Sequence, residues 1–412
     1  MRVLMLAQSY APIVGGVERM VEDLSDELSR RGHQVSVATL RQPGGAPEPN
    51  GVSVHTLGSL VHRVPAIKLD AERHHAPPLP DPEIAFGLRR LLRRERPDVV
   101  HAHNWLVNSY LPLDRDSGPA LVLSMHDYGL VCATKRFLNR GADCTGPRTG
   151  KCIRCAGDYY GRLKGAGVAL GTRLAEPRLR GAVDVFLPVS TAVRDRCGFG
   201  EGELYRVVPN FIGELPPPPL DGDPRLEGLP TEPFILYFGD VTIDKGGGQL
   251  IEAYKALDDP PPLVLIGRCY LKEAERTPGV LALGRMPHRL AIEALRRSLF
   301  TVVPSLLPET FGLVALETAA AGKPIVASRI GGLTDVVAEG ETGLLVTPGS
   351  REELAAAMRQ LIGDGELRAR MGDAARKWVK QFGPDAVVPR FEDAYELALE
   401  ARRGKATRGA QG

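Results

Sequence analysis

Two glutamates flank a Phe-Gly step in the stretch PSLLPETFGLVALETAAAGKPIVAS, residues 304–328. Glu309 precedes the step, and Glu317 falls about one turn into a helix that we expect to begin near Leu313. Gly312 would let the backbone approach a ligand, and the amide groups at a helix start favour an anion. One acid for sugar hydroxyls and one for ribose hydroxyls would suit a nucleotide-sugar. Two solvated glutamates would explain the pattern as well, because acids stabilise a helix start.

Other polar residues also follow apolar, strand-like runs. Lys245 and Gly246 come after FILYFGD, Arg268 ends PLVLIGR, and His126 ends ALVLSMH. Ligands of open parallel sheets bind beyond the carboxyl ends of the strands, so these residues are candidates for a binding site. Two further histidines, in VVHAHNW (99–105), alternate along an expected strand and should point to opposite faces.

The elements that must position these residues follow a regular order. Short Val- and Leu-rich runs alternate with helical stretches, which predicts an α/β protein with doubly wound parallel sheets. A chain of 412 residues exceeds what one core usually serves, so two domains are expected. The predicted parts are an N-terminal domain at 1–208, a proline-rich linker at 209–233, a C-terminal domain at 234–383, and a helix at 384–403 that returns to the N-terminal domain.

Composition narrows the class of partner. A net charge of +2 gives no overall attraction to nucleic acid. The first apolar run is too short for a secretory signal, and no run approaches the ~18 apolar residues of a membrane span, which predicts a cytoplasmic protein. The segment GLRRLLRRERP (87–97) has leucines on one side and five arginines. It could lie on an anionic membrane at the inner face, or it could be an ordinary surface helix that packs its leucines.

Four cysteines gather in an expected insert at 128–158. The spacing is C-x11-C-x7-C-x2-C, and the final CxxC is a usual metal-chelating step. We expect structural zinc, with redox-active or unliganded thiols and an iron–sulfur cluster as alternatives. Four protein ligands would leave no open coordination position on the zinc, so the metal would be structural. Catalysis itself is expected to need no cofactor. The expected ligands are Cys132, Cys144, Cys152 and Cys155.

Several of these motifs, taken in order, resemble the retaining glycosyltransferases of family four. The pattern EtfGLvaLEtaAaGkPIVaS closely resembles that family's signature, with its two glutamates at Glu309 and Glu317. GGVER (15–19) is similar to the family's N-terminal glycine loop, and KGG (245–247) to its phosphate-binding lysine loop. The resemblance covers nearly the whole chain. It implies a GT-B fold, in which two Rossmann-like domains face each other across a cleft.

The resemblance also implies roles for individual residues. Glu309 would contact the transferred sugar, Glu317 the ribose, and Lys245 the leaving diphosphate, while His126 would hold the sugar near its reacting carbon. Such an enzyme would move a sugar from a nucleotide-sugar to a glycan or lipid-linked acceptor in cell-envelope or exopolysaccharide assembly. The full expected donor site consists of Gly15, Gly16, Lys245, Gly246, Arg268, Glu309, Phe311, Gly312, Leu313 and Glu317.

One departure from the family pattern keeps other functions open. Asp240 stands where the family usually has an arginine, and a carboxylate beside a diphosphate would be repulsive unless it points away. Asp240 therefore favours a catalytically idle nucleotide- or glycan-binding protein as an alternative. A sugar-nucleotide epimerase shares the architecture but lacks the two-glutamate signature. A dinucleotide-dependent oxidoreductase is disfavoured, because no G-x-G-x-x-G follows the first strand.

Overall fold

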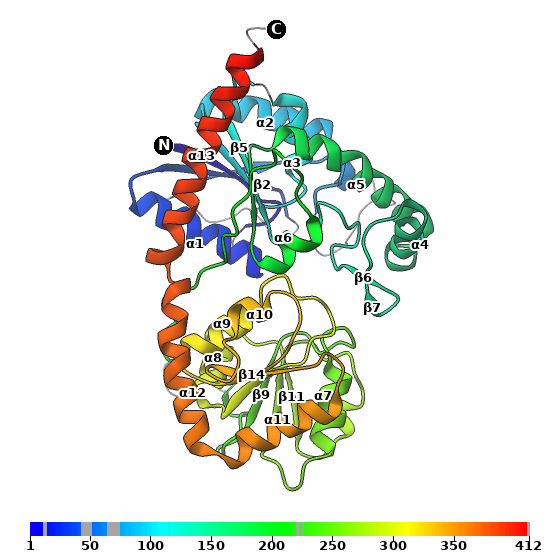
Figure 1. Cartoon of the computed structure of the whole chain (residues 1–412), viewed down its shortest axis with the longest axis vertical. Coiled ribbons are helices and arrows are strands. Elements are labelled where there is room, and N and C mark those ends of the chain that lie inside the picture. The colour runs from blue at the N-terminus through cyan, green and yellow to red at the C-terminus, as the bar shows by residue number, and fades with distance from the viewer. Residues whose placement is uncertain are drawn as a thin grey trace. The chain divides into compact units, whose positions relative to one another are not determined.

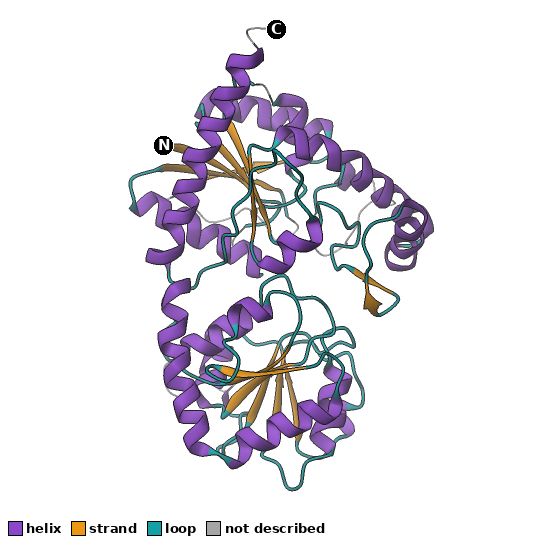
Figure 2. Cartoon of the chain, viewed as in Figure 1, coloured by secondary structure: helices purple, strands orange, loops and turns teal. Residues whose placement is uncertain are grey.

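The computed structural model describes residues 1–10, 15–42, 52–63, 75–114, 116–219, 223 and 226–409. The chain divides into two compact units, Met1–Phe211 with Pro384–Gly412, and Ile212–Gly383. Figures 1 and 2 show that the strands of each unit gather in one central sheet with helices around it.

The first unit contains a six-stranded parallel sheet among its described residues, in the order β3-β2-β1-β4-β5-β8. Its central strands read as buried apolar runs, as expected when helices cover both faces of a sheet. Every residue of β5 is buried, for example. The strands are β1 (Arg2–Leu6), β2 (Gln34–Leu40), β3 (Ser53–Leu57), β4 (Val99–Ala102), β5 (Ala120–Met125) and β8 (Val185–Pro188).

The helices of the first unit include one from the far end of the sequence. Helix α13 (Pro384–Gly409) packs on the same core cluster as α1 (Gly16–Arg30), and Figure 1 shows it running beside this sheet. Its Tyr395 is fully buried and hydrogen-bonds His101 of β4. The other helices are α2 (Pro82–Glu95), α3 (Val107–Tyr110), α4 (Thr149–Tyr160), α5 (Arg162–Ala182) and α6 (Thr191–Cys197), and a small hairpin joins β6 (Leu138–Asn139) to β7 (Ala142–Asp143).

The second unit repeats the same topology. Its parallel sheet has the order β11-β10-β9-β12-β13-β14 within the described range. The strands are β9 (Ile235–Phe238), β10 (Leu263–Ile266), β11 (Val280–Gly284), β12 (Phe300–Val303), β13 (Ile325–Ser328) and β14 (Gly343–Val346). The helices are α7 (Gly247–Lys255), α8 (His288–Arg297), α9 (Leu313–Ala320), α10 (Leu333–Val336), α11 (Arg351–Gly363) and α12 (Gly365–Trp378).

In both sheets the strand order reverses beside the first strand, between β1 and β4 and between β9 and β12. This topology confirms the predicted α/β class with two doubly wound, Rossmann-like units. In such sheets the order reversal opens a crevice at the carboxyl ends of the strands. Residues that follow β9 and β12 are therefore placed where a ligand can bind.

The arginine-rich helix predicted at 87–97 is the second half of α2. Leu88 and Leu91 are buried in the first unit, whereas Arg89, Arg90, Arg93 and Arg94 are exposed. The leucines therefore pack inside the protein, as the surface-helix alternative predicts, and only the arginines face outward. Across the described residues, no helix is both long and apolar enough to cross a bilayer.

Candidate functional site

Lys245 and Glu309, the lysine and the first glutamate of the signature, contact each other beside the point where the strand order reverses between β9 and β12. Lys245 lies in the loop after β9, and its Nζ is 2.6 Å from Oε1 of Glu309, which follows β12. The same carboxylate oxygen accepts a hydrogen bond of 2.9 Å from the Ser305 hydroxyl. Glu309 keeps only 15% of its side-chain exposure. It therefore lies in a hydrogen-bonded network and is not a solvated turn residue.

Glycine places the lysine loop directly against the end of β12. Gly246 has φ +75° and precedes α7, and a Cβ at this position would lie 1.8 Å from the carbonyl oxygen of Pro304. No side chain fits there, and the left-handed backbone also disfavours one. The backbone amide of Lys245 is fixed by the Thr242 hydroxyl at 3.2 Å. The KGG motif therefore sets the position of the ammonium group through backbone packing.

A second pair of glycines holds the Glu309 loop. A Cβ at Gly331 would lie 2.1 Å from the carbonyl oxygen of Glu309, and one at Gly332 would lie 2.5 Å from that of Thr310. The amide of Gly332 also donates to the Glu309 carbonyl at 2.7 Å. The sequence motif alone does not reveal this packing, because it joins segments that are more than twenty residues apart.

Helix α9 begins where the signature predicts. Gly312 precedes it with φ +101°, and Leu313 is its first residue. The Phe311 side chain is buried and lies edge-on to Phe382, which fixes the backbone just before the helix. The N-termini of α7 and α9 are suited to an anion, because the amides of a first helical turn and the helix dipole both favour negative charge.

Glu317 faces a partner that sequence reasoning missed. It is 7% exposed, and its Oε1 lies 2.6 Å from Nε2 of His288, the first residue of α8. The two glutamates of the signature thus contact different partners, a lysine and a histidine. The alternative of two solvated glutamates is wrong, since neither side chain is exposed. The only sequence signal for His288 was its place after β11, a strand that joins the same sheet.

The departure at Asp240 has a structural explanation. The backbone amide of Arg268 donates to Oδ1 of Asp240 at 3.1 Å, and the Tyr237 hydroxyl donates to the Asp240 carbonyl at 3.0 Å. The carboxylate is therefore directed at the end of β10. Gly267 permits this contact, because a Cβ there would meet the Gly239 carbonyl oxygen at 2.0 Å. The Arg268 side chain itself is exposed.

The predicted residues of the first unit lie at two strand ends. Gly15 precedes α1, Gly16 is its first residue, and the Gly15 carbonyl accepts the amide of Arg19 at 3.1 Å. Residues 11–14 of the same loop lie outside the described chain. His126 follows β5, with its Nε2 3.0 Å from Nδ1 of His103.

Three buried histidines form one cluster. The rings of His101 and His103 are 4.1 Å apart between centroids, so the prediction that they point to opposite faces is wrong. The reason is that successive residues of a strand alternate between its faces, so residues two positions apart share a face. Burial lowers the pKa of His126 to about 4 and that of His101 to about 3. Burial also holds the pKa of His103 well below its usual value, so the cluster is neutral near pH 7.

The predicted zinc site at Cys132, Cys144, Cys152 and Cys155 is not formed. All four are free, half-buried cysteines, and the described part of the chain contains no group of His, Cys, Asp and Glu that could hold a metal ion. The physical reason is that each sulfur has a separate local partner. These partners are the Thr134 hydroxyl for Cys132, the Lys151 ammonium for Cys144, the Arg148 amide for Cys152 and the Leu138 carbonyl for Cys155.

The cysteines are nevertheless part of a packed structure. Burial raises the pKa of the Cys155 thiol, and the three neighbouring cysteines add to this effect. Helices α4 and α5 pack closely, because a Cβ at Gly165 would lie 2.2 Å from the Ala156 carbonyl oxygen.

The fold defines a protein of two Rossmann-like units. Residues 224–378 match the family model "Glycosyl transferases group 1", and residues 15–210 match "Glycosyl transferase 4-like domain". The chain is 30% identical to a glycogen synthase of Mycobacterium tuberculosis, over 98% of this chain and 96% of that protein. The chain therefore belongs to the group 1 glycosyltransferase family, and the prediction that it is a glycosyltransferase is confirmed.

Solved structures agree on the architecture. Sucrose-phosphate synthase from Thermosynechococcus elongatus superposes with a TM-score of 0.74 at 19% identity, covering 97% of this chain and 99% of that one. The Anabaena protein HepE in complex with UDP-glucose gives a TM-score of 0.66 at 18% identity, covering 96% and 99%. At these identities the likeness shows the fold alone, which is the GT-B fold that the resemblance implied.

Proposed function

We propose that this glycosyltransferase transfers a sugar from a nucleotide-sugar, with retention of anomeric configuration, to a glycan or lipid-linked acceptor. The observation that carries the proposal is the 2.6 Å contact between Lys245 and Glu309 beside the N-termini of α7 and α9. A diphosphate held by the Lys245 ammonium and these helix amides has its sugar next to the Glu309 carboxylate. One group then recognises the anion and the other recognises sugar hydroxyls.

The chemistry requires stabilisation of the leaving group. The bond between the anomeric carbon and the diphosphate oxygen breaks, and a bond to the acceptor oxygen forms on the same face of the sugar. The acceptor's proton passes to the departing diphosphate. A fixed ammonium and helix amides can stabilise the developing negative charge without a metal ion. Glu317, paired with His288 and deeper in α9, is assigned to the ribose.

His126 is proposed to orient the sugar or acceptor. With a pKa of about 4 the ring is neutral and not imidazolium near pH 7, so it does not serve as a general acid there. Its bond to His103 fixes the ring. A neutral, fixed imidazole supplies a hydrogen bond at a defined position.

The acceptor is proposed to belong to cell-envelope or exopolysaccharide assembly. A relative named as a glycogen synthase supports a glycan as one acceptor class. Peripheral association with an anionic membrane remains a prediction, and it rests on the exposed arginines of α2 and on Phe86 of the same helix, which is 65% exposed. Co-sedimentation with phosphatidylglycerol vesicles checks it, and equal sedimentation with neutral vesicles argues against it.

A panel of UDP-, GDP-, ADP- and TDP-sugars tests the activity. We expect nucleotide release from one donor, increased by a suitable acceptor, and a product whose anomeric configuration by NMR matches the donor. Tight donor binding without turnover with any acceptor would instead indicate the catalytically idle binding protein. Interconversion of free nucleotide-sugars would indicate the epimerase, and an inverted product would exclude retention.

A further inference from the structure

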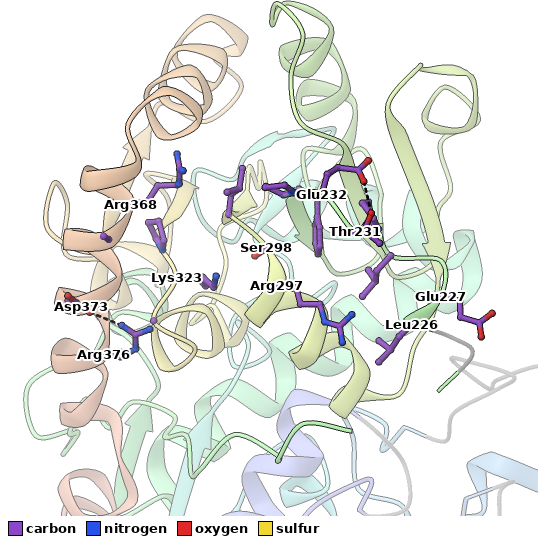
Figure 3. Close-up of a pocket in the computed structure, with 18 residues that line it drawn as sticks. Leu226, Glu227, Thr231, Glu232, Arg297, Ser298, Lys323, Arg368, Asp373 and Arg376 are labelled. Carbon is purple, nitrogen blue, oxygen red and sulfur yellow. Dashed lines mark hydrogen bonds and ion pairs between the residues drawn. The ribbon is translucent and has the colours of Figure 1, made fainter. Parts of the chain in front are cut away.

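A cavity lies at the amino ends of the strands of the C-terminal sheet, opposite the carboxyl ends that carry the proposed donor site. It measures about 830 Å³ and is lined by residues that immediately precede three strands, namely Phe234 before β9, Leu299 before β12 and Pro324 before β13 (Figure 3). Glu309, by contrast, follows the carboxyl end of β12. The cavity is therefore separate from the proposed donor site, and the group 1 signature assigns no ligand to it.

One wall of this cavity is strongly cationic. Lys323 follows α9, and Arg368 and Arg376 project from α12, as Figure 3 shows. Arg376 pairs with Asp373 at 2.7 Å, and Arg368 donates to the Ile362 carbonyl at 2.9 Å. Within the described chain, Lys323 has no ion pair. Three cations thus lie beside one acid, Asp373, in this part of the lining. Arg297, Glu227 and Glu232 also line the cavity.

Close backbone packing fixes the position of this wall. A Cβ at Gly372 would lie 2.3 Å from the Gly322 carbonyl oxygen, and a Cβ at Gly322 would lie 2.2 Å from Nε of Arg376. Helix α12 therefore lies directly against the turn that carries Lys323. Positions 368, 372 and 376 are four residues apart and share one helix face, so both guanidinium groups are held on the side of this turn.

The arrangement is electrostatically unfavourable by itself. Burial lowers the pKa of Lys323, and the charges of Arg376 and Arg368 add to this effect. An anion in the cavity would relieve the repulsion and form charge-assisted hydrogen bonds. The lining also offers Leu229, Pro233 and Phe234, an apolar surface suited to the body of an organic ligand, next to the polar Glu227 and Glu232.

We propose that this cavity binds a phosphorylated small molecule, with the phosphate between Lys323 and Arg376 and the organic body on the wall around Phe234. The proposal does not depend on the transferase activity, because it concerns the other edge of the sheet. It gives the C-terminal unit a second ligand site, remote from the donor site.

Calorimetric titration of the full chain with inorganic phosphate and with ribose 5-phosphate tests this site. The protein carries Lys245→Met, which removes the charged side chain that the proposed donor site offers to phosphate, and the Lys323 variants then report on the cavity. We expect saturable binding of ribose 5-phosphate that is tighter than that of phosphate. Adding Lys323→Met should weaken it by about ten- to a hundredfold, the loss expected for a hydrogen bond to a charged group. Adding Lys272→Met, at an exposed lysine of the same unit, should leave the affinity unchanged.

Two further variants separate binding from folding. Lys323→Arg keeps the charge and should retain binding, and Arg376→Gln should weaken it even if Lys323→Met fails to fold. The thermal midpoint of the Lys245→Met protein should rise with ribose 5-phosphate and that of the Lys323→Met double variant should not. Absence of saturable binding, or equal affinity with and without Lys323, would overturn the site. Equal affinity for phosphate and ribose 5-phosphate would overturn the claim that the cavity binds the organic part of the ligand.

Discussion

At the scale of single residues, the Lys245–Glu309 pair makes a quantitative prediction. Lys245→Met removes the charge that stabilises the leaving diphosphate, and Glu309→Gln removes a charged acceptor for sugar hydroxyls. Each variant should lower kcat by about two to three orders of magnitude, as does removal of a fixed transition-state contact elsewhere. Because the two side chains touch, the double variant should lose less than the product of the single losses.

These variants are measured as initial rates with the donor and acceptor from the panel. Glu317→Gln provides the matched control, because it also neutralises a signature glutamate. Because Glu317 is assigned to the ribose, Glu317→Gln should raise the KM for the donor more than it lowers kcat. If Lys245→Met or Glu309→Gln keeps near wild-type kcat while folded, the donor-site assignment fails.

At the scale of elements, the glycines that hold the loops are as important as the polar residues. Gly246→Ala would force a methyl group against the Pro304 carbonyl and into a left-handed backbone. We expect a loss of about 2 kcal/mol or more in the free energy of unfolding, together with reduced donor binding. Two positions later, Gly248 has open space around it. Gly248→Ala should therefore be neutral or slightly stabilising.

Urea unfolding of the two alanine variants checks this prediction. The comparison is informative because both changes add one methyl group to the same segment. If both variants unfold at the wild-type midpoint, the lysine loop does not depend on backbone contact with β12. If both lose stability equally, the effect belongs to α7 in general and not to the glycine contact.

The elements themselves were largely predictable from sequence, because their signal is local. Buried Val and Leu runs defined the strands, and the helix expected to begin near Leu313 is α9, whose first residue is Leu313. The contacts of the site were less predictable, because they join distant segments. His288 reaches Glu317 across 29 positions, and Gly331 supports Glu309 across 22. The cysteine spacing suggested zinc, but spacing does not encode the separate hydrogen-bond partners that each sulfur finds.

At the scale of the whole molecule, the return of the C-terminal helix couples the stability of the first unit to pH. Tyr395 of α13 bonds His101 at 2.8 Å inside the core, and His103 and His126 complete the neutral cluster. In the unfolded chain these histidines take up protons as the pH falls through about 6.5. In the folded chain burial delays protonation of His126 to about pH 4 and of His101 to about pH 3.

The unfolded state therefore binds more protons between pH 6.5 and pH 4, and the free energy of unfolding should fall as the pH falls through this window. Within this window each histidine that is protonated only in the unfolded chain contributes about 1.4 kcal/mol per pH unit to the slope of the free energy of unfolding. Burial raises the pKa of Asp23 to about 6, and it also raises the pKa of Asp26 and of Asp114, so these aspartates act in the opposite direction in the lower part of the window and reduce the net slope. Urea unfolding at pH 7, 6 and 5 measures the slope. His101→Gln should reduce it by about one histidine's share, whereas Tyr395→Phe, which keeps the imidazole, should preserve it. A slope that His101→Gln leaves unchanged would mean that this buried imidazole is not held neutral by the fold.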